Sequence, residues 1–366
     1  MKRIIIAVLT AILTLSVSYA AEKVKPKKIE ASELTLVGKL FPDTPNPYHR
    51  VDTVKYKGFT EYENFQQRMA SGISVAFRTN SKSIAVQAVF GEILKHRSCS
   101  DIAARGFDLF VREPEGWAWA AANSHRSDAP EVLAKPVTLI ENMDGSMREF
   151  LLYLPNFSEI KRLKIIVDGD AVIEKADIPF KGRICMFGSS FTHGTSTSRP
   201  GMTYPAQLGR LTGYQFMSLG CGGNSKLQPY FAEALADVDA DVFVFDSFSN
   251  PKASLIEERL FTFIDIIRKK HPETPLVFLN TIYRSTRRYN TVVEETERAK
   301  MEMAEKMMAE CLKKYENVYW INTVESRSDE IETSVDGTHP SDYGYYLMAC
   351  SIKDRLMEIF EERVKF

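Results

Sequence analysis

The sequence predicts a chain of two domains, an all-β sandwich followed by an α/β domain built on a parallel sheet. Residues 34–178 hold many short segments in which apolar and polar residues alternate between turn residues, which is typical of a β-sandwich. From residue 179 to 366, short apolar strands alternate with helical segments, which indicates a parallel sheet covered by helices on both sides. A chain of 366 residues with 44% hydrophobic content is long enough for two packed cores.

Charge and cysteine content exclude several classes of function. The net charge is −1, so there is no electrostatic case for binding nucleic acid or an anionic membrane. An odd number of cysteines at irregular spacing does not make a disulfide framework, and no Cys-x-x-Cys pair indicates zinc. We therefore expect no cofactor and no metal, and nothing in the sequence indicates the oligomeric state. The five cysteines are Cys99, Cys185, Cys221, Cys311 and Cys350.

The first 20 residues have the pattern of an export signal. Lys2 and Arg3 precede an apolar run, Ile4–Leu15, and Ser18-Tyr19-Ala20 then supplies small residues for cleavage before Ala21. The alternative is a membrane anchor, although the run is short for a span. No second apolar stretch approaches ~18 residues, so the mature protein is expected to be periplasmic or secreted without stable membrane insertion.

Residues 21–33 are rich in lysine and are expected to form a linker to the β-sandwich of residues 34–178. The sandwich is predicted to be jelly-roll-like, without a long helical period. Ile73, Val75 and Phe77 alternate with polar or small residues, and a second alternating stretch begins at Ile84 after a Ser-Lys-Ser turn. Further strands are predicted at residues 107–111, 150–154 and 164–167.

The second domain, residues 179–366, contains five short apolar runs that predict buried parallel strands. Helices are predicted at residues 255–270 and 303–312, and the methionine-rich side of the second helix is expected to face the core. In parallel sheets of this kind the active site lies beyond the carboxyl ends of the strands. The predicted strands are residues 184–187, 215–219, 242–245, 276–279 and 318–321.

Two short segments carry the chemistry of serine-based acyl transfer. Ser190, in Gly-Ser-Ser after a predicted strand, is the candidate nucleophile, and it needs a base to take its proton. His339 is the candidate base, because it alone among six histidines has an acid three residues before it and a Pro-Ser-Asp turn behind it. That acid, Asp336, would hold the imidazole ring in the required tautomer.

Three donors are candidates for an oxyanion hole. The backbone N–H of Ser190 lies at the start of a predicted helix, where free N–H groups favour negative charge. Gly223 follows the second strand of the α/β domain, and glycine lets a backbone N–H approach a ligand closely. The side-chain amide of Asn250 follows the third strand. Each motif alone is weak evidence for a catalytic site. Their order along the chain and their placement after predicted strands together indicate one.

The order of these motifs resembles the SGNH (GDSL-type) hydrolases over residues 183–366. The resemblance implies a three-layer α/β/α fold and assigns Ser190 as nucleophile, Gly223 and Asn250 to the oxyanion hole, and Asp336 and His339 as acid and base. The family's usual acid before the nucleophile is replaced here by Ser189, and the usual Gly-x-Asn-Asp block reads Phe-Ser-Asn-Pro. Because the two serines are adjacent, the choice of Ser190 depends on this alignment.

Gly106-Phe107-Asp108-Leu109-Phe110 resembles the Gly-x-Asp-Leu-Tyr signature of a β-domain that accompanies such hydrolases, with Phe at the last position. The arrangement is similar to bacterial carbohydrate esterases, which implies an acetylated oligo- or polysaccharide as substrate. Trp117 and Trp119 share one face of a predicted strand and would either stack on a sugar or, as we expect, pack in the core or domain junction. A lipid esterase or thioesterase and a non-catalytic glycan-binding protein stay as alternatives, and a metal-dependent deacetylase lacks a ligand cluster.

Overall fold

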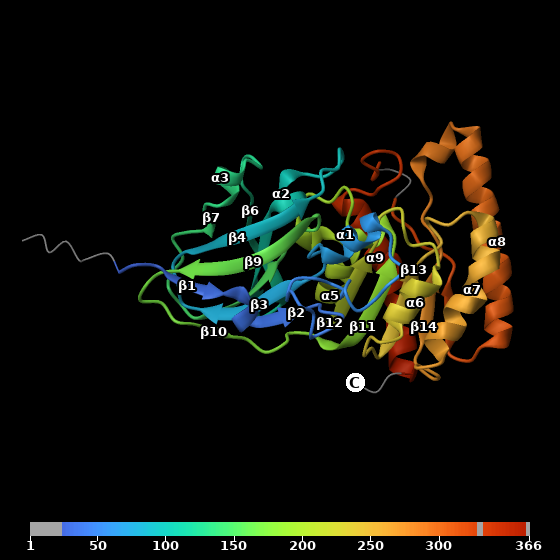
Figure 1. Ribbon diagram of the computed structural model, residues 1–366, viewed down its shortest axis with the longest axis horizontal. Coiled ribbons are helices and arrows are strands. Elements are labelled where there is room, and N and C mark those ends of the chain that lie inside the picture. The colour runs from blue at the N-terminus through green and yellow to red at the C-terminus, as the bar shows by residue number, and fades with distance from the viewer. Residues whose placement is uncertain (1–23, 328–331, 364–366) are drawn as a thin grey trace, which may run out of the picture.

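The computed structural model describes residues 24–327 and 332–363, which form a β-sandwich and an α/β domain lying side by side along the longest axis (Figure 1). The predicted signal peptide, residues 1–20, lies outside the described residues. Among the helices that the structure describes, none is both long and apolar enough to cross a membrane.

The sandwich consists of two antiparallel sheets with an apolar core between them. One sheet has the strand order β1-β9-β4-β7 and the other β10-β3-β8-β5-β6, with β2 paired to β3. Alternating side chains such as Val75, Phe77, Ile84 and Val86 fill the core, so the predicted sandwich is confirmed. The strands are β1 (Lys27–Glu30), β2 (Thr35–Val37), β3 (Ser74–Thr79), β4 (Ile84–Ile93), β5 (Phe107–Glu113), β6 (Gly116–Asn123), β7 (Val137–Ile140), β8 (Arg148–Tyr153), β9 (Ser158–Val167) and β10 (Ile173–Lys175).

The predicted linker is wrong in part, because β1 and a 3₁₀ turn, η1 (Ala31–Glu33), lie within residues 21–33. β1 pairs with β9, with Ile29 opposite Ile165. Most of this edge strand is charged, so its sequence has no alternating apolar pattern. The sandwich domain, residues 34–178, also contains three short helices that were not predicted, α1 (Glu61–Arg68), α2 (Asp101–Arg105) and α3 (Pro130–Leu133).

The α/β domain has five parallel strands in the order β12-β11-β13-β14-β15, and all five predicted strands are confirmed. The strands are β11 (Lys181–Gly188), β12 (Tyr214–Gly220), β13 (Val242–Asp246), β14 (Leu276–Leu279) and β15 (Val318–Ile321). The chain leaves β11 on one side to form β12 and returns to its other side to form β13. The loops beyond the carboxyl ends of β11 and β13 therefore leave in opposite directions, and ligands of open α/β sheets bind at such a switch point.

Helices cover both faces of this sheet. On one face lie α6 (Pro229–Leu235), α7 (Ala253–Arg268) and α8 (Thr291–Lys314), and on the other α5 (Tyr204–Thr212) and α9 (Asp342–Arg363). The methionine-rich side of α8 faces the core as predicted, with Met307 and Met308 buried, but Leu312 is exposed. The remaining short helices are α4 (Ser190–His193), η2 (Pro200–Met202) and η3 (Ser285–Arg288).

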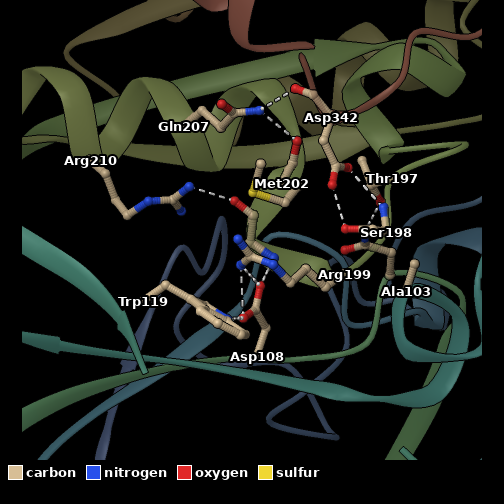
Figure 2. Close-up of polar contacts among 12 residues, drawn as sticks. Ala103, Asp108, Trp119, Thr197, Ser198, Arg199, Met202, Gln207, Arg210 and Asp342 are labelled. Atoms are coloured by element: carbon tan, nitrogen blue, oxygen red, sulfur yellow. Dashed lines mark hydrogen bonds and ion pairs between the residues drawn. The ribbon is translucent and has the colours of Figure 1, made fainter. Parts of the chain in front are cut away.

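The domain junction buries the second face of the β10-β3-β8-β5-β6 sheet. Asp108 of β5 is fully buried there and accepts hydrogen bonds from Arg199, at 2.7 Å, and from the backbone N–H of Gly201, at 2.9 Å (Figure 2). Trp119 Nε1 donates to the same carboxylate at 3.1 Å. The aspartate of the Gly-x-Asp-Leu-Phe motif therefore binds the two domains to each other through hydrogen bonds.

The two tryptophans behave differently at this junction. Trp117 packs against Phe180 with ring centroids 6.5 Å apart, as the packing interpretation predicts. Trp119 keeps 56% of its surface exposed, with the Arg199 guanidinium 5.1 Å from its ring centroid. Arg199 is thus a junction residue paired with Asp108.

Candidate active site

The sharp turn after β11 presents two adjacent serines in different directions. Ser189 is the N-cap of α4, is fully buried, and donates its hydroxyl proton to Asp246 Oδ2 at 3.0 Å. Ser190 is only partly buried, and its Oγ lies 2.9 Å from His339 Nε2. The structure therefore separates a hydroxyl engaged in holding the turn from one that faces a base.

Asp246, at the end of β13, was missed by the sequence analysis as a site residue. Its Oδ2 accepts hydrogen bonds from Ser189 Oγ and Thr192 Oγ1, at 3.0 and 2.9 Å, and so fixes both ends of the turn. Burial raises the pKa of Asp246 to about 6, even though these donors lower it. The signal available in the sequence was an acidic residue at the end of an apolar strand, where the active site of such sheets lies.

His339 connects Ser190 to Asp336. Its Nδ1 lies 2.9 Å from Asp336 Oδ2, and a carboxylate only accepts hydrogen bonds, so the ring proton is on Nδ1 and Nε2 is free to accept the Ser190 proton. Asp336 also accepts from the backbone N–H groups of Thr338 and His339, at 3.1 and 2.8 Å. Although burial raises the pKa of Asp336, these bonds and the His339 ring lower it to about 2.

The surroundings of His339 favour its neutral form. Burial lowers the pKa of His339, Asp336 raises it, and His96 and Arg284 lower it further. The ring of His96 lies against that of His339 in a T-shaped contact, with centroids 5.8 Å apart. A neutral imidazole beside a serine hydroxyl can remove the hydroxyl proton as the oxygen attacks a carbonyl.

The glycine-rich loop after β12 borders Ser190. A Cβ atom on Gly222 would lie 3.5 Å from Ser190 Cβ, and the next residue, Gly223, has φ +74° with open space around it. Asn250 reaches the same loop, where its Oδ1 accepts from the Ser225 backbone N–H at 3.3 Å. No partner of Asn250 Nδ2 lies in residues 24–327 or 332–363, so this N–H₂ group can donate to a ligand.

Gln66 of α1 fixes the orientation of this loop. Its Nε2 donates to the Gly222 carbonyl at 3.0 Å, and its Oε1 accepts from Asn224 Nδ2 at 2.9 Å. In a trans peptide the C=O and N–H groups point in opposite directions. The Gly223 N–H, in the same peptide unit as the Gly222 carbonyl, therefore points away from Gln66.

Other residues of the N-terminal region support the glycine-rich loop and the end of α4. The buried Arg50 guanidinium donates to the Gly220 carbonyl at 2.9 Å, and Gln67 Nε2 donates to Cys221 Sγ at 3.1 Å. His193, the last residue of α4, donates from Nε2 to the Asn156 carbonyl at 2.8 Å. Helix α1 lies at the domain junction, where its Glu63 accepts hydrogen bonds from Gln228 Nε2 at 3.2 Å and Tyr230 Oη at 3.0 Å (Figure 1).

The structure thus brings together five residues that the sequence selected for one site. Ser190, His339 and Asp336 form a hydrogen-bonded series. Gly223 lies on the loop that borders Ser190, and Asn250 bonds to that loop at Ser225. Asp246, Gln66 and His96 also lie at this site and were not predicted from the sequence. In the part of the chain that the structure describes, no cluster of three or more His, Cys, Asp or Glu side chains could hold a metal ion.

Two family models match the chain. Residues 181–357 match the GDSL-like lipase/acylhydrolase family, and residues 26–173 match the N-terminal domain of SGNH-hydrolase-type esterases, which carries the Gly-x-Asp-Leu-Tyr signature. A search of curated proteins found no match.

Solved structures resemble this chain over more than nine-tenths of its length. A protein from Bacteroides ovatus described as a GDSL-like lipase is 35% identical with a TM-score of 0.87, covering 92% of this chain and 98% of its own. The salicylyl-acyltransferase SsfX3 of a tetracycline biosynthetic pathway is 23% identical (TM-score 0.69, 93% and 99% covered). A family two carbohydrate esterase from Cellvibrio japonicus is 10% identical (0.59, 92% and 98%) and shares the fold. The chain belongs to the GDSL-like lipase/acylhydrolase family and is a carboxylic ester hydrolase.

Proposed function

We propose that this family member is an exported serine esterase that hydrolyses acetyl and other short acyl esters of carbohydrates. The observation that carries the proposal is the hydrogen-bonded series from Asp336 through His339 to Ser190, with steps of 2.9 Å on both sides of the imidazole. Ser190 is the nucleophile, His339 the general base, and Asp336 the group that orients the ring and stabilises the imidazolium.

The reaction proceeds in two halves. Ser190 Oγ attacks the ester carbonyl while His339 Nε2 takes its proton, and the imidazolium then gives this proton to the leaving alkoxide. The negative oxygen of the tetrahedral intermediate accepts hydrogen bonds from the Ser190 N–H, the Gly223 N–H and Asn250 Nδ2. Water, activated by His339, then hydrolyses the acyl-enzyme and regenerates Ser190.

Carbohydrate is the proposed alcohol part of the ester for two reasons. Solved relatives that share the fold include a family two carbohydrate esterase from Clostridium thermocellum in complex with cellohexaose, at 14% identity and a TM-score of 0.54. The exposed ring of Trp119, held at Nε1 by Asp108, adds an aromatic surface of the kind on which sugars stack.

Export is proposed from the pattern of residues 1–20 alone. Expression of the full chain followed by cell fractionation and N-terminal sequencing would test it. A periplasmic or secreted product that begins at Ala21 is expected. An uncleaved product in the membrane fraction would favour the anchor instead.

The test of the esterase proposal is acetate release from acetylated xylan, mannan, pectin and xyloglucan, with p-nitrophenyl esters of rising chain length alongside. Ser190→Ala should abolish turnover and leave the fold intact. Ser189→Ala is the matched control, because it removes the neighbouring hydroxyl that bonds Asp246 while Thr192 still bonds Asp246, so turnover should stay measurable. Activity in Ser190→Ala at the wild-type level would refute the nucleophile assignment.

Each alternative has its own result. Strong cleavage of long acyl chains without glycan release would favour a lipid esterase or thioesterase. Glycan binding with no ester cleavage of any kind would favour a non-catalytic binding protein, although all three reacting groups are present.

A further inference from the structure

A loop of the β-sandwich domain reaches the proposed catalytic histidine. Residues 94–100 connect β4 to α2, and they bond to Ser196 and Ser198 in the loop that follows α4. Ser196 Oγ donates to Ser98 Oγ at 2.7 Å, and the Ser196 N–H donates to Cys99 Sγ at 3.4 Å. Ser100 Oγ donates to the Ser198 carbonyl.

This loop is connected to the His339 segment through one more residue. Ser198 donates from its N–H to Asp342 Oδ1 at 2.8 Å, and Asp342 is the first residue of α9, three positions after His339 (Figure 2). Burial also raises the pKa of the Cys99 thiol to about 11, as expected for a thiol packed in the junction. The loop is therefore fastened beside the histidine.

His96 is the residue of this loop that touches the site. The Ser98 N–H donates to His96 Nδ1 at 3.3 Å, so Nδ1 has no proton and a neutral ring carries its proton on Nε2. Within residues 24–327 and 332–363, His96 Nε2 has no hydrogen-bond partner. A half-buried ring held at Nδ1, with a free Nε2–H donor, lies 5.8 Å from His339.

The chemistry decides which part of an ester lies there. His339 must hand its proton to the leaving oxygen, so the alcohol part of the substrate lies next to His339. The acyl oxygen lies toward the Gly222 and Gly223 loop, which borders Ser190 instead. A side chain in contact with His339 therefore faces the alcohol part.

We infer that His96 forms part of a binding subsite for the alcohol part of the ester, donating a hydrogen bond from Nε2 to a sugar hydroxyl. The inference rests on the proposed function, because it requires a hydroxylated leaving group. It gives the sandwich domain a role in substrate selection.

The test compares two esters with rings of equal size, methyl mono-O-acetyl-xyloside and cyclohexyl acetate, which has no hydroxyls. His96→Ala should lower kcat/KM for the sugar ester about 5- to 10-fold, the effect of one net hydrogen bond, and leave cyclohexyl acetate within about twofold. His96→Gln, which keeps an amide donor in reach, should recover part of the loss. Lys95→Ala is the matched control, because Lys95 lies on the same loop and pairs with Asp128.

A second readout excludes a merely structural role. His339 is faced by Asp336, Arg284 and His96, and His96 is one of the groups that lower the pKa of His339. The midpoint of the acid limb of kcat/KM against pH should therefore move upward in His96→Ala, and stay in place in Lys95→Ala.

Each result distinguishes the subsite from the proposed function. Equal losses on both esters in His96→Ala, or an unchanged preference for the sugar ester, would overturn the subsite while the esterase proposal stands. A wild-type enzyme that shows no preference for the sugar ester would overturn both, since the alcohol would not be a carbohydrate.

Discussion

Replacing Gln66 by methionine should slow turnover without weakening substrate binding. The substitution preserves volume but removes two hydrogen bonds to the oxyanion loop, to the Gly222 carbonyl and from Asn224. Each bond has a net value of about 0.5–1.5 kcal/mol, so the conformation of the loop that points the Gly223 N–H at the oxyanion loses about 1–3 kcal/mol of stabilisation. The upper limit is about 2.7–4 kcal/mol, the effect of deleting an oxyanion donor.

The expected effect is a fall in kcat of about 10- to 100-fold with KM little changed, because the oxyanion exists only after Ser190 attacks. Asn224 also donates to the Gly222 carbonyl at 3.2 Å, which keeps the loss below the limit. Steady-state kinetics with p-nitrophenyl acetate would measure both constants, with thermal unfolding to check the fold.

Gln67→Met is the matched control. Gln67 is the next residue of α1 and is equally buried, but it donates to the Cys221 sulfur and not to the loop backbone. Its kcat should stay within about threefold of the wild type. Wild-type kcat in Gln66→Met, or an equal fall in both variants, would refute the argument that Gln66 orients the Gly223 N–H.

Three further results are expected. Because burial, His96 and Arg284 lower the pKa of His339, the base form persists into mildly acidic solution, so kcat/KM against pH should have an acid-limb midpoint below about 6.5; a midpoint above that value would contradict the burial argument. Arg199→Ala leaves the buried Asp108 carboxylate without its charged partner, although the Gly201 N–H and Trp119 Nε1 still donate to it, and should lower the free energy of unfolding by about 3 kcal/mol. Arg355→Ala, which breaks an exposed pair with Glu358, should cost less than about 1 kcal/mol, and equal melting temperatures of the two variants would show that the junction pair is dispensable. Asp336→Asn should lower kcat by about 10²- to 10⁴-fold without abolishing turnover, and wild-type kcat in this variant would remove Asp336 from the mechanism.

The sequence predicted those parts of the structure whose signals are local. The five parallel strands are continuous apolar runs, and Ser190 and His339 lie in short segments that carry their own turn residues. The choice between Ser189 and Ser190 rested on resemblance alone, and Asp246 supplies the physical reason by binding the Ser189 hydroxyl. That contact joins the end of β11 to the end of β13, two segments far apart in the sequence, so no local sequence pattern predicts it.

The missed residues lie where local patterns carry no information. Helix α1 reads Glu-Tyr-Glu-Asn-Phe-Gln-Gln-Arg, with too few apolar residues to show a helical period, yet it supplies Gln66. Gln66 contacts a loop 156 residues further along the chain. His96 lies in a connection between a strand and a five-residue helix, and its partner is 243 positions away, so only the packing of the two domains identifies it.

These contacts argue against treating the sandwich as a module attached to an independent catalytic domain. Arg50 holds the carbonyl that begins the oxyanion loop, Gln66 holds the next part of that loop, and Asn156 holds the end of the nucleophile helix. Each of these contacts gives a partner to a polar group at the domain junction, and a buried polar group is costly to leave without a partner. The site residues of the second domain therefore depend on contacts from both domains, since Asp246 of the α/β domain holds the turn that carries Ser190 and Gln66 of the first domain holds the loop that carries Gly223.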